Sequence, residues 1–94
     1  MLDPDPKRVR AVLHEVLEVQ IRTGDPPETK KTFDRLVASG IPKSEVWRLL
    51  SVVLMCELFD VLKSERPFDL KRYVEMLEAL PRVPEELVDE DEEE

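Results

Sequence analysis

The sequence predicts an all-α protein, a small four-helix bundle whose helices are joined by short, proline-marked loops. Apolar residues recur at helical spacing along most of the chain, and the segments between them are short and carry proline or glycine. No segment alternates with the two-residue period of a strand, and the sequence shows no hairpin turn or internal repeat. Short connections favour antiparallel neighbours.

The first helix is expected from Pro6 to about Arg22. Asp5 is a suitable N-cap, and Pro6 suits the first helical position, where its missing N–H costs nothing. Gln20 lies among the apolar residues of this helix and needs hydrogen-bond partners if it is buried. The apolar face itself is expected to comprise Val9, Val12, Leu13, Val16, Leu17 and Val19.

The second helix is expected after the interruption TGDPPE, with Asp25 as its cap and Pro26 as its first residue. Gly40 ends it, at a position that favours a positive φ. A third helix should then begin at Pro42 and continue to residue 63 or 64.

The fourth helix follows the break at ERPFD, where the proline disfavours helix at the residue before it. Asp69 is its expected N-cap, and Pro81 stops it. Between them, Leu70, Tyr73, Val74, Leu77 and Leu80 repeat at helical spacing.

The segment from Val46 to Leu62 is apolar at thirteen of its seventeen positions, and so it is apolar on nearly every side. Such a helix is either the buried centre of a fold or a helix shared with a second subunit. We therefore expect a homodimer. The interface residues expected for it are Trp47, Leu50, Leu54 and Leu58.

Glu57 lies on the apolar side of this central helix, and a carboxylate buried there needs a cation, hydrogen-bond donors or a raised pKa. Gln20, His14 or a backbone N–H could supply a hydrogen bond. Two other interpretations are exposure at the edge of a dimer and a functional site. The helical wheels favour Gln20 as the partner.

The charge of the chain separates a neutral body from an acidic tail. The formal net charge is −8, and residues 85–94 contain eight acids and no base, which leaves fourteen acids and fourteen bases in the rest. We expect a single helical domain over residues 1–84 and a disordered acidic tail over residues 85–94. The tail either solubilises the chain or binds a basic protein partner. The sequence has no basic stripe for nucleic acid.

A soluble cytoplasmic protein is expected. The N-terminal sequence lacks the apolar stretch of a signal peptide, and the segment 46–62 is short and charged for a membrane span. Cys56 lies alone within that apolar segment and is expected to act as a small core residue. The chain has no Asn and a single Gln, and 38% of its residues are charged, a balance typical of thermophilic proteins.

No catalytic triad, phosphate loop or cofactor motif is present, so we expect neither an enzyme nor a bound cofactor. The candidate metal ligands are His14 and Glu18, four residues apart on one helical face, with Glu57 as a third. The same His–Glu pair could also be a surface ion pair.

Three segments resemble a family of short, all-helical bacterial domains of unknown function: HEVLEVQI, GDPPETKKTFDRL and RPFDLKRYVEMLEAL, within residues 10–80. The resemblance implies that His14, Glu18 and Gln20 recur in that family, together with histidines where this chain has Ser44 and Arg48. Such a set would resemble a metal site, but an arginine cannot be a ligand. We expect Arg48 instead to form a bidentate bridge to Glu15 or Glu18.

Two functions follow as hypotheses. The first is a structural or interaction module that associates with itself and has no chemistry of its own. The alternative is a metal-binding or degenerate metalloprotein that uses His14 and Glu18.

Overall fold

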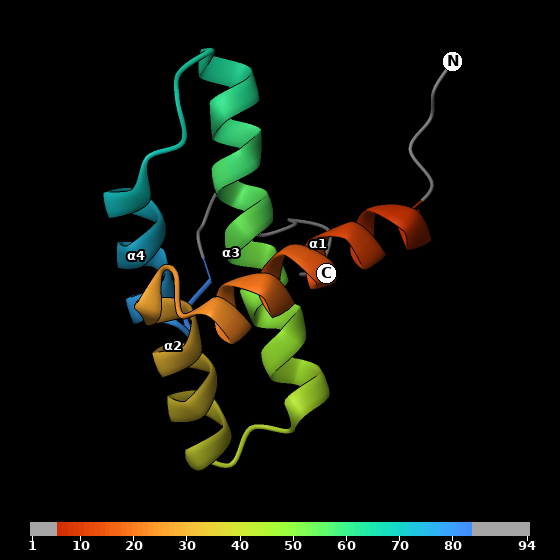
Figure 1. Ribbon diagram of the computed structural model, residues 1–94, viewed down its shortest axis with the longest axis vertical. Coiled ribbons are helices and arrows are strands. Elements are labelled where there is room, and N and C mark those ends of the chain that lie inside the picture. The colour runs from red at the N-terminus through yellow and green to blue at the C-terminus, as the bar shows by residue number, and fades with distance from the viewer. Residues whose placement is uncertain (1–5, 84–94) are drawn as a thin grey trace, which may run out of the picture.

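The computed structural model describes residues 6–83, and this part of the chain forms four helices joined by short loops (Figure 1). The prediction of an all-α four-helix bundle is confirmed. The expected N-cap at Asp5 and the acidic tail at 85–94 lie outside the described residues. The helices are α1 (Pro6–Thr23), α2 (Pro27–Ala38), α3 (Lys43–Ser64) and α4 (Leu70–Ala79).

Proline and glycine delimit the helices largely as expected. The N-cap of α2 is Pro26, with no side-chain cap, so the prediction that Asp25 caps this helix was wrong. Gly40 follows α2 with a φ of 101°, which a residue without Cβ adopts at no steric cost. Asp69 caps α4 as predicted, because its side chain accepts a hydrogen bond from the backbone N–H of Arg72.

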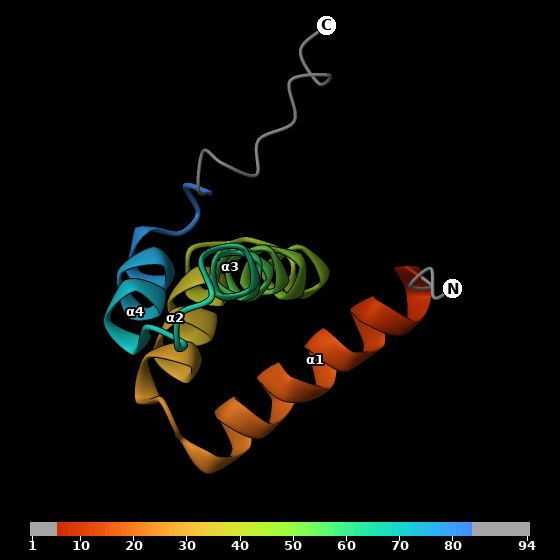
Figure 2. The same cartoon turned by 90° about the horizontal axis from the view of Figure 1, so that it is seen from above.

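Helix α3 is the centre of the fold. It packs against the other three helices, and Figure 2 shows it nearly end-on, with α2 and α4 on one side and α1 running past another. Helices α2 and α4 each run antiparallel to α3, whereas α1 crosses α3 obliquely (Figure 1). The antiparallel arrangement expected from short loops therefore holds for α2, α3 and α4 and not for α1. The N-terminal half of α1 extends away from the rest of the molecule.

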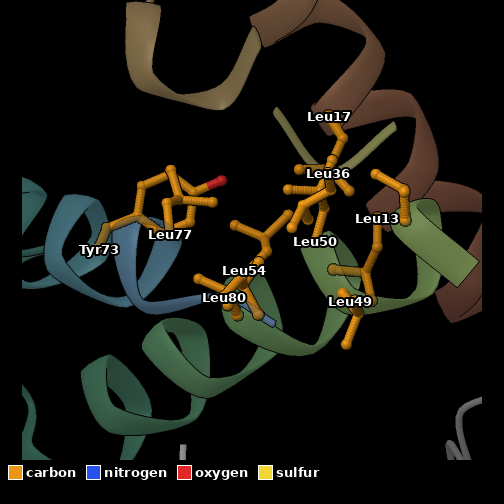
Figure 3. Packing of buried hydrophobic residues seen from close by; sticks show 11 residues of the cluster. Leu13, Leu17, Leu36, Leu49, Leu50, Leu54, Tyr73, Leu77 and Leu80 are labelled. Carbon is orange, nitrogen blue, oxygen red and sulfur yellow. The ribbon is translucent and has the colours of Figure 1, made fainter. Parts of the chain in front are cut away.

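All four helices share one hydrophobic core, in which leucines predominate (Figure 3). Leu50 and Leu54 are buried at its centre, so these two expected interface residues are unavailable to a partner, and that part of the interface prediction was wrong. Cys56 is also buried. The buried members of the core cluster are Leu13, Leu17, Leu36, Val46, Leu49, Leu50, Val53, Leu54, Tyr73, Leu77 and Leu80. None of the four helices combines the length and the apolar character that crossing a bilayer requires.

Candidate interaction surface

An open cleft of about 750 Å³ lies between the N-terminal halves of α1 and α3. Helix α1 crosses α3 obliquely (Figure 1), and Leu13 and Leu17 hold α1 on the core. Its surface is mostly apolar and is contributed by Val9, Leu13, Trp47, Val52 and Met55. The remaining lining residues are Arg10, His14, Ser44, Arg48 and Ser51. A cleft of this size and lining is large enough to receive side chains of a partner.

Trp47 forms part of the cleft wall and is half-buried. Its ring lies 4.1 Å from the imidazole of His14 and 5.3 Å from the ring of Phe33, measured between ring centroids. These contacts fix the indole at the junction of α1, α2 and α3, with one part of it open to the cleft. Trp47, expected from the sequence as an interface residue, is therefore still placed for that role.

Exposed apolar residues extend from the cleft along both helices. On α1 the valines follow the 3–4–3 spacing of a coiled-coil seam, and the first of them, Val9, lines the cleft. On α3, Met55 lines the cleft and Leu58 and Leu62 follow at the same spacing, with Leu62 74% exposed. We call the cleft and these two rows the outer apolar face. The rows are Val9, Val12, Val16 and Val19 on α1, and Met55, Leu58 and Leu62 on α3.

The sequence-based prediction placed the valine row on the apolar face of the first helix together with Leu13 and Leu17, and all four valines are instead exposed. The core-facing side of α1 carries Leu13 and Leu17, and the valines lie on its flank. The signal for this arrangement in the sequence is a row of valines beside the row formed by Leu13 and Leu17. It makes the apolar arc of α1 wider than one contact with α3 can cover.

The expected metal ligands are not brought together. The Nδ1 atom of His14 lies 4.0 Å from Glu18 Oε2, and the two residues form an exposed i,i+4 pair. Glu57 lies ten residues beyond Trp47 on α3, which is about 15 Å along the helix axis, and its carboxylate faces the loop before α4. Within residues 6–83, no group of three His, Cys, Asp or Glu side chains is placed to hold a metal ion. The prediction that Glu57 joins His14 and Glu18 was wrong.

The residues where the resemblance places histidines, Ser44 and Arg48, do line the cleft beside His14. Their side chains do not suit a metal, because the guanidinium of Arg48 is cationic and a serine hydroxyl is a poor ligand. Arg48 donates from Nε and Nη2 to the two carboxylate oxygens of Glu45, at 3.0 and 2.6 Å. Its bidentate partner is thus within α3, whereas the sequence-based prediction named Glu15 or Glu18.

Glu57 is fully buried, as its place on the helical wheel predicted. Its Oε2 accepts a 2.8 Å hydrogen bond from the backbone N–H of Asp69. Arg72 Nε lies 3.7 Å from Oε1, and Arg66 Nη2 lies 4.0 Å from Oε2. Of the three hydrogen-bond partners considered from the sequence, a backbone N–H is therefore the one observed. The carboxylate ties the C-terminal half of α3 to the N-terminus of α4.

Gln20 does not pair with Glu57, so that hypothesis was wrong. Its Oε1 accepts hydrogen bonds from Thr29 Oγ1, at 2.6 Å, and from the Tyr73 hydroxyl, at 2.8 Å. Thr29 and Tyr73 are fully buried, and burial raises the pKa of the Tyr73 phenol. The contact joins α1, α2 and α4 and is structural.

No protein-family model, curated protein or solved structure matches this chain. The resemblance to short helical bacterial domains therefore stays a prediction, and the candidate surface rests on its own geometry.

Proposed function

We propose that this protein is a small helical interaction module that associates with a second copy of itself through the outer apolar face. The observation that carries the proposal is the continuity of that face. Two rows of apolar residues with coiled-coil spacing begin at one apolar cleft, and all of their members except the partly buried Met55 are exposed. Single exposed hydrophobic residues are ordinary on a protein surface, but a contiguous apolar patch indicates an interface.

In the proposed dimer, the valine row of each copy packs against the α3 row and the cleft of the other. A two-fold arrangement satisfies both rows at once, because an isologous interface uses the same patch on each subunit. Val12 is 51% exposed and Leu62 is 74% exposed, so both have most of their burial still to gain. Burying an aliphatic side chain of this kind contributes about 1.5–3 kcal/mol relative to leaving it exposed.

The interface residues proposed from the structure differ from those expected from the sequence. Trp47 and Leu58 are retained, and Leu50 and Leu54 are replaced by residues of the same helix that face outward. The module acts by association. We place it in the cytoplasm, where a buried cysteine such as Cys56 stays reduced.

Sedimentation velocity across a micromolar concentration series tests the proposal. We expect the intact chain to form a dimer and the variants Val12→Glu and Leu62→Glu to shift it toward monomer, because each places a charge in the apolar contact. Ala11→Glu is the matched control, since Ala11 is exposed on α1 and lies away from the valine row. An intact chain that remains monomeric throughout the series would contradict the proposal, as would equal effects of all three substitutions.

A further inference from the structure

The cleft between α1 and α3 has the size and lining of a site for a small molecule. Its volume of about 750 Å³ lies within the range of about 300–1,000 Å³ that such sites have. The α3 part of the lining extends from Ser44 to Met55, which is about 16 Å along the helix axis. The lining is mostly apolar, and its polar members include two arginines and a histidine but no acid. A cleft with this shape and lining suits an aliphatic chain that carries a negative charge.

The charges around the cleft identify Arg10 as its unpaired cation. Glu45 accepts both hydrogen bonds from Arg48, and Glu18 Oε2 lies 4.0 Å from His14 Nδ1. Two arginines and two carboxylates therefore balance in number around the cleft. Each carboxylate has another residue as its neighbour, whereas the side chain of Arg10 makes no ion pair or hydrogen bond within residues 6–83. An anion in the cleft thus meets a guanidinium that no carboxylate of the described chain neutralises.

Arg10 lies on the same side of α1 as the aromatic wall of the cleft. It precedes His14 by four residues, which places the two side chains on one face of the helix, and the His14 ring lies 4.1 Å from that of Trp47. Glu15, the remaining acid of α1, follows Arg10 by five residues and so lies about 140° around the helix. A guanidinium binds a carboxylate through two parallel hydrogen bonds. The cleft therefore combines apolar surface for a chain with a group that recognises one carboxylate.

We propose that the α1–α3 cleft binds a small amphipathic carboxylate, of the chemical class of the fatty acids, and that this ligand releases the second copy of the protein. The aliphatic chain packs against Leu13, Trp47 and Met55, and the carboxylate accepts hydrogen bonds from Arg10. Ligand and partner exclude one another, because the proposed dimer seats the partner in the same cleft. The release therefore rests on the proposed self-association, whereas the binding does not.

Titration with decanoate, below its micelle concentration, tests the binding. Trp47 is the only tryptophan and lies in the cleft wall, so its indole N–H resonance reports occupancy of the cleft. The titration is made on the intact chain and on Leu62→Glu, whose substitution lies outside the cleft lining and which the proposed interface predicts to be monomeric. We expect the resonance to shift and to saturate in both, with the tighter apparent affinity in the monomeric variant.

Recognition of the carboxylate is tested by removing either charge. Arg10→Gln should weaken decanoate binding about tenfold, since it removes a charge-assisted hydrogen-bonded pair, and should leave the binding of decanol unchanged. Arg22→Gln is the matched control, because Arg22 is exposed in the last turn of α1. A Trp47 resonance that decanoate leaves in place would overturn the binding. Equal affinities for decanoate and decanol, or equal effects of the two arginine substitutions, would overturn the recognition of the carboxylate.

Sedimentation velocity of the intact chain with decanoate tests the release. At about ten times the dissociation constant of the ligand, mass action should raise the dimer dissociation constant about a hundredfold, because both clefts of a dimer must be empty. An unchanged dimer dissociation constant would overturn the release. A chain that is already monomeric without decanoate would overturn the proposed self-association and the release with it, while the Trp47 titration still decides the binding.

Discussion

Gln20 of α1 and Tyr73 of α4 are joined by a 2.8 Å hydrogen bond, although α1 and α4 have no direct backbone packing within the described structure. The Tyr73 hydroxyl points away from α4 across the core (Figure 3). Thr29 of α2 donates to the same oxygen of Gln20, so one amide oxygen satisfies two buried hydroxyls. A buried hydroxyl without an acceptor is costly, and this shared acceptor therefore fixes how three helices meet.

Gln20→Leu should destabilise the fold by about 2–4 kcal/mol, because it leaves two buried hydroxyls without their acceptor. Tyr73→Phe should cost only about 1 kcal/mol, since Gln20 keeps its bond from Thr29. Urea denaturation followed by circular dichroism measures both. Equal losses from the two variants would show that the shared acceptor is not what stabilises this junction.

The buried phenol also predicts a loss of stability in alkali. Burial raises the pKa of Tyr73 above its ordinary value of 10.0, against the opposing effect of its hydrogen bonds with Thr29 and Gln20. The folded state then holds this proton more tightly than the unfolded state does. Its contribution is fully present below pH 10 and is lost as the pH rises from there through the folded pKa.

The measurement is the free energy of unfolding between about pH 9 and pH 12. The intact chain should lose stability with a steeper slope above pH 10 than Tyr73→Phe, which has no phenol at this position. Parallel slopes for the two chains would contradict the prediction.

The helices were predictable because their signals are local. Prolines, glycines and the cap at Asp69 mark the ends, and apolar spacing marks the faces. The partners of Gln20 and Glu57 were not predictable, because they depend on how α1 crosses α3 and on the path of the loop before α4. Helical wheels give the direction of a side chain and not the distance between helices, and so they paired these two polar residues with each other.

The sequence did not predict the outer apolar face, for a related reason. A wheel of α1 shows one broad apolar arc, and nothing in it says which part the core covers. The core covers only the side of α1 that carries Leu13 and Leu17, and Val12 and Val16 are exposed on its flank. Only the structure separates the two seams.

Arg35 provides a cap that the sequence did not reveal. Its guanidinium extends from α2 to the C-terminal end of α4 and donates to the carbonyls of Leu80, at 2.8 Å, and Leu77, at 3.1 Å. The last carbonyls of a helix lack intrahelical donors, and a cation also suits this end of the helix dipole. Arg35→Met should cost about 1–2 kcal/mol. Arg35→Lys should recover only part of this loss in thermal denaturation, because one ammonium cannot reproduce the guanidinium fork.

Asp60 should make the fold sensitive to acid. It accepts hydrogen bonds from Arg66 and Arg72, and the Arg66 hydrogen bond in particular lowers the pKa of Asp60 below its ordinary value of 3.8. The unfolded state then takes up the proton first as the pH falls, so this stabilisation is present above pH 3.8 and is lost below it. Asp60→Asn should flatten the dependence of unfolding free energy on pH in that range. A dependence as steep as that of the intact chain would contradict this assignment.

Two variants of Glu57 separate the contribution of its charge to stability from the contribution of its hydrogen bond. Its Oε2 accepts a hydrogen bond from the backbone N–H of Asp69. Within the described residues its buried Oε1 has no hydrogen-bond partner, and Arg72 Nε lies 3.7 Å from it. Glu57→Gln keeps an oxygen for the Asp69 N–H and removes the charge that faces Arg66 and Arg72. Glu57→Leu removes both.

We expect Glu57→Gln to cost about 1–2 kcal/mol and Glu57→Leu about 1 kcal/mol more, the difference being the hydrogen bond to the α4 N-terminus. Hydrogen exchange of the Asp69 amide localises the effect, since protection should survive in the glutamine variant and fall in the leucine variant. A leucine variant as stable as the intact chain would mean that apolar packing alone suffices at this position, as happens when a buried ion pair is replaced by well-packed side chains.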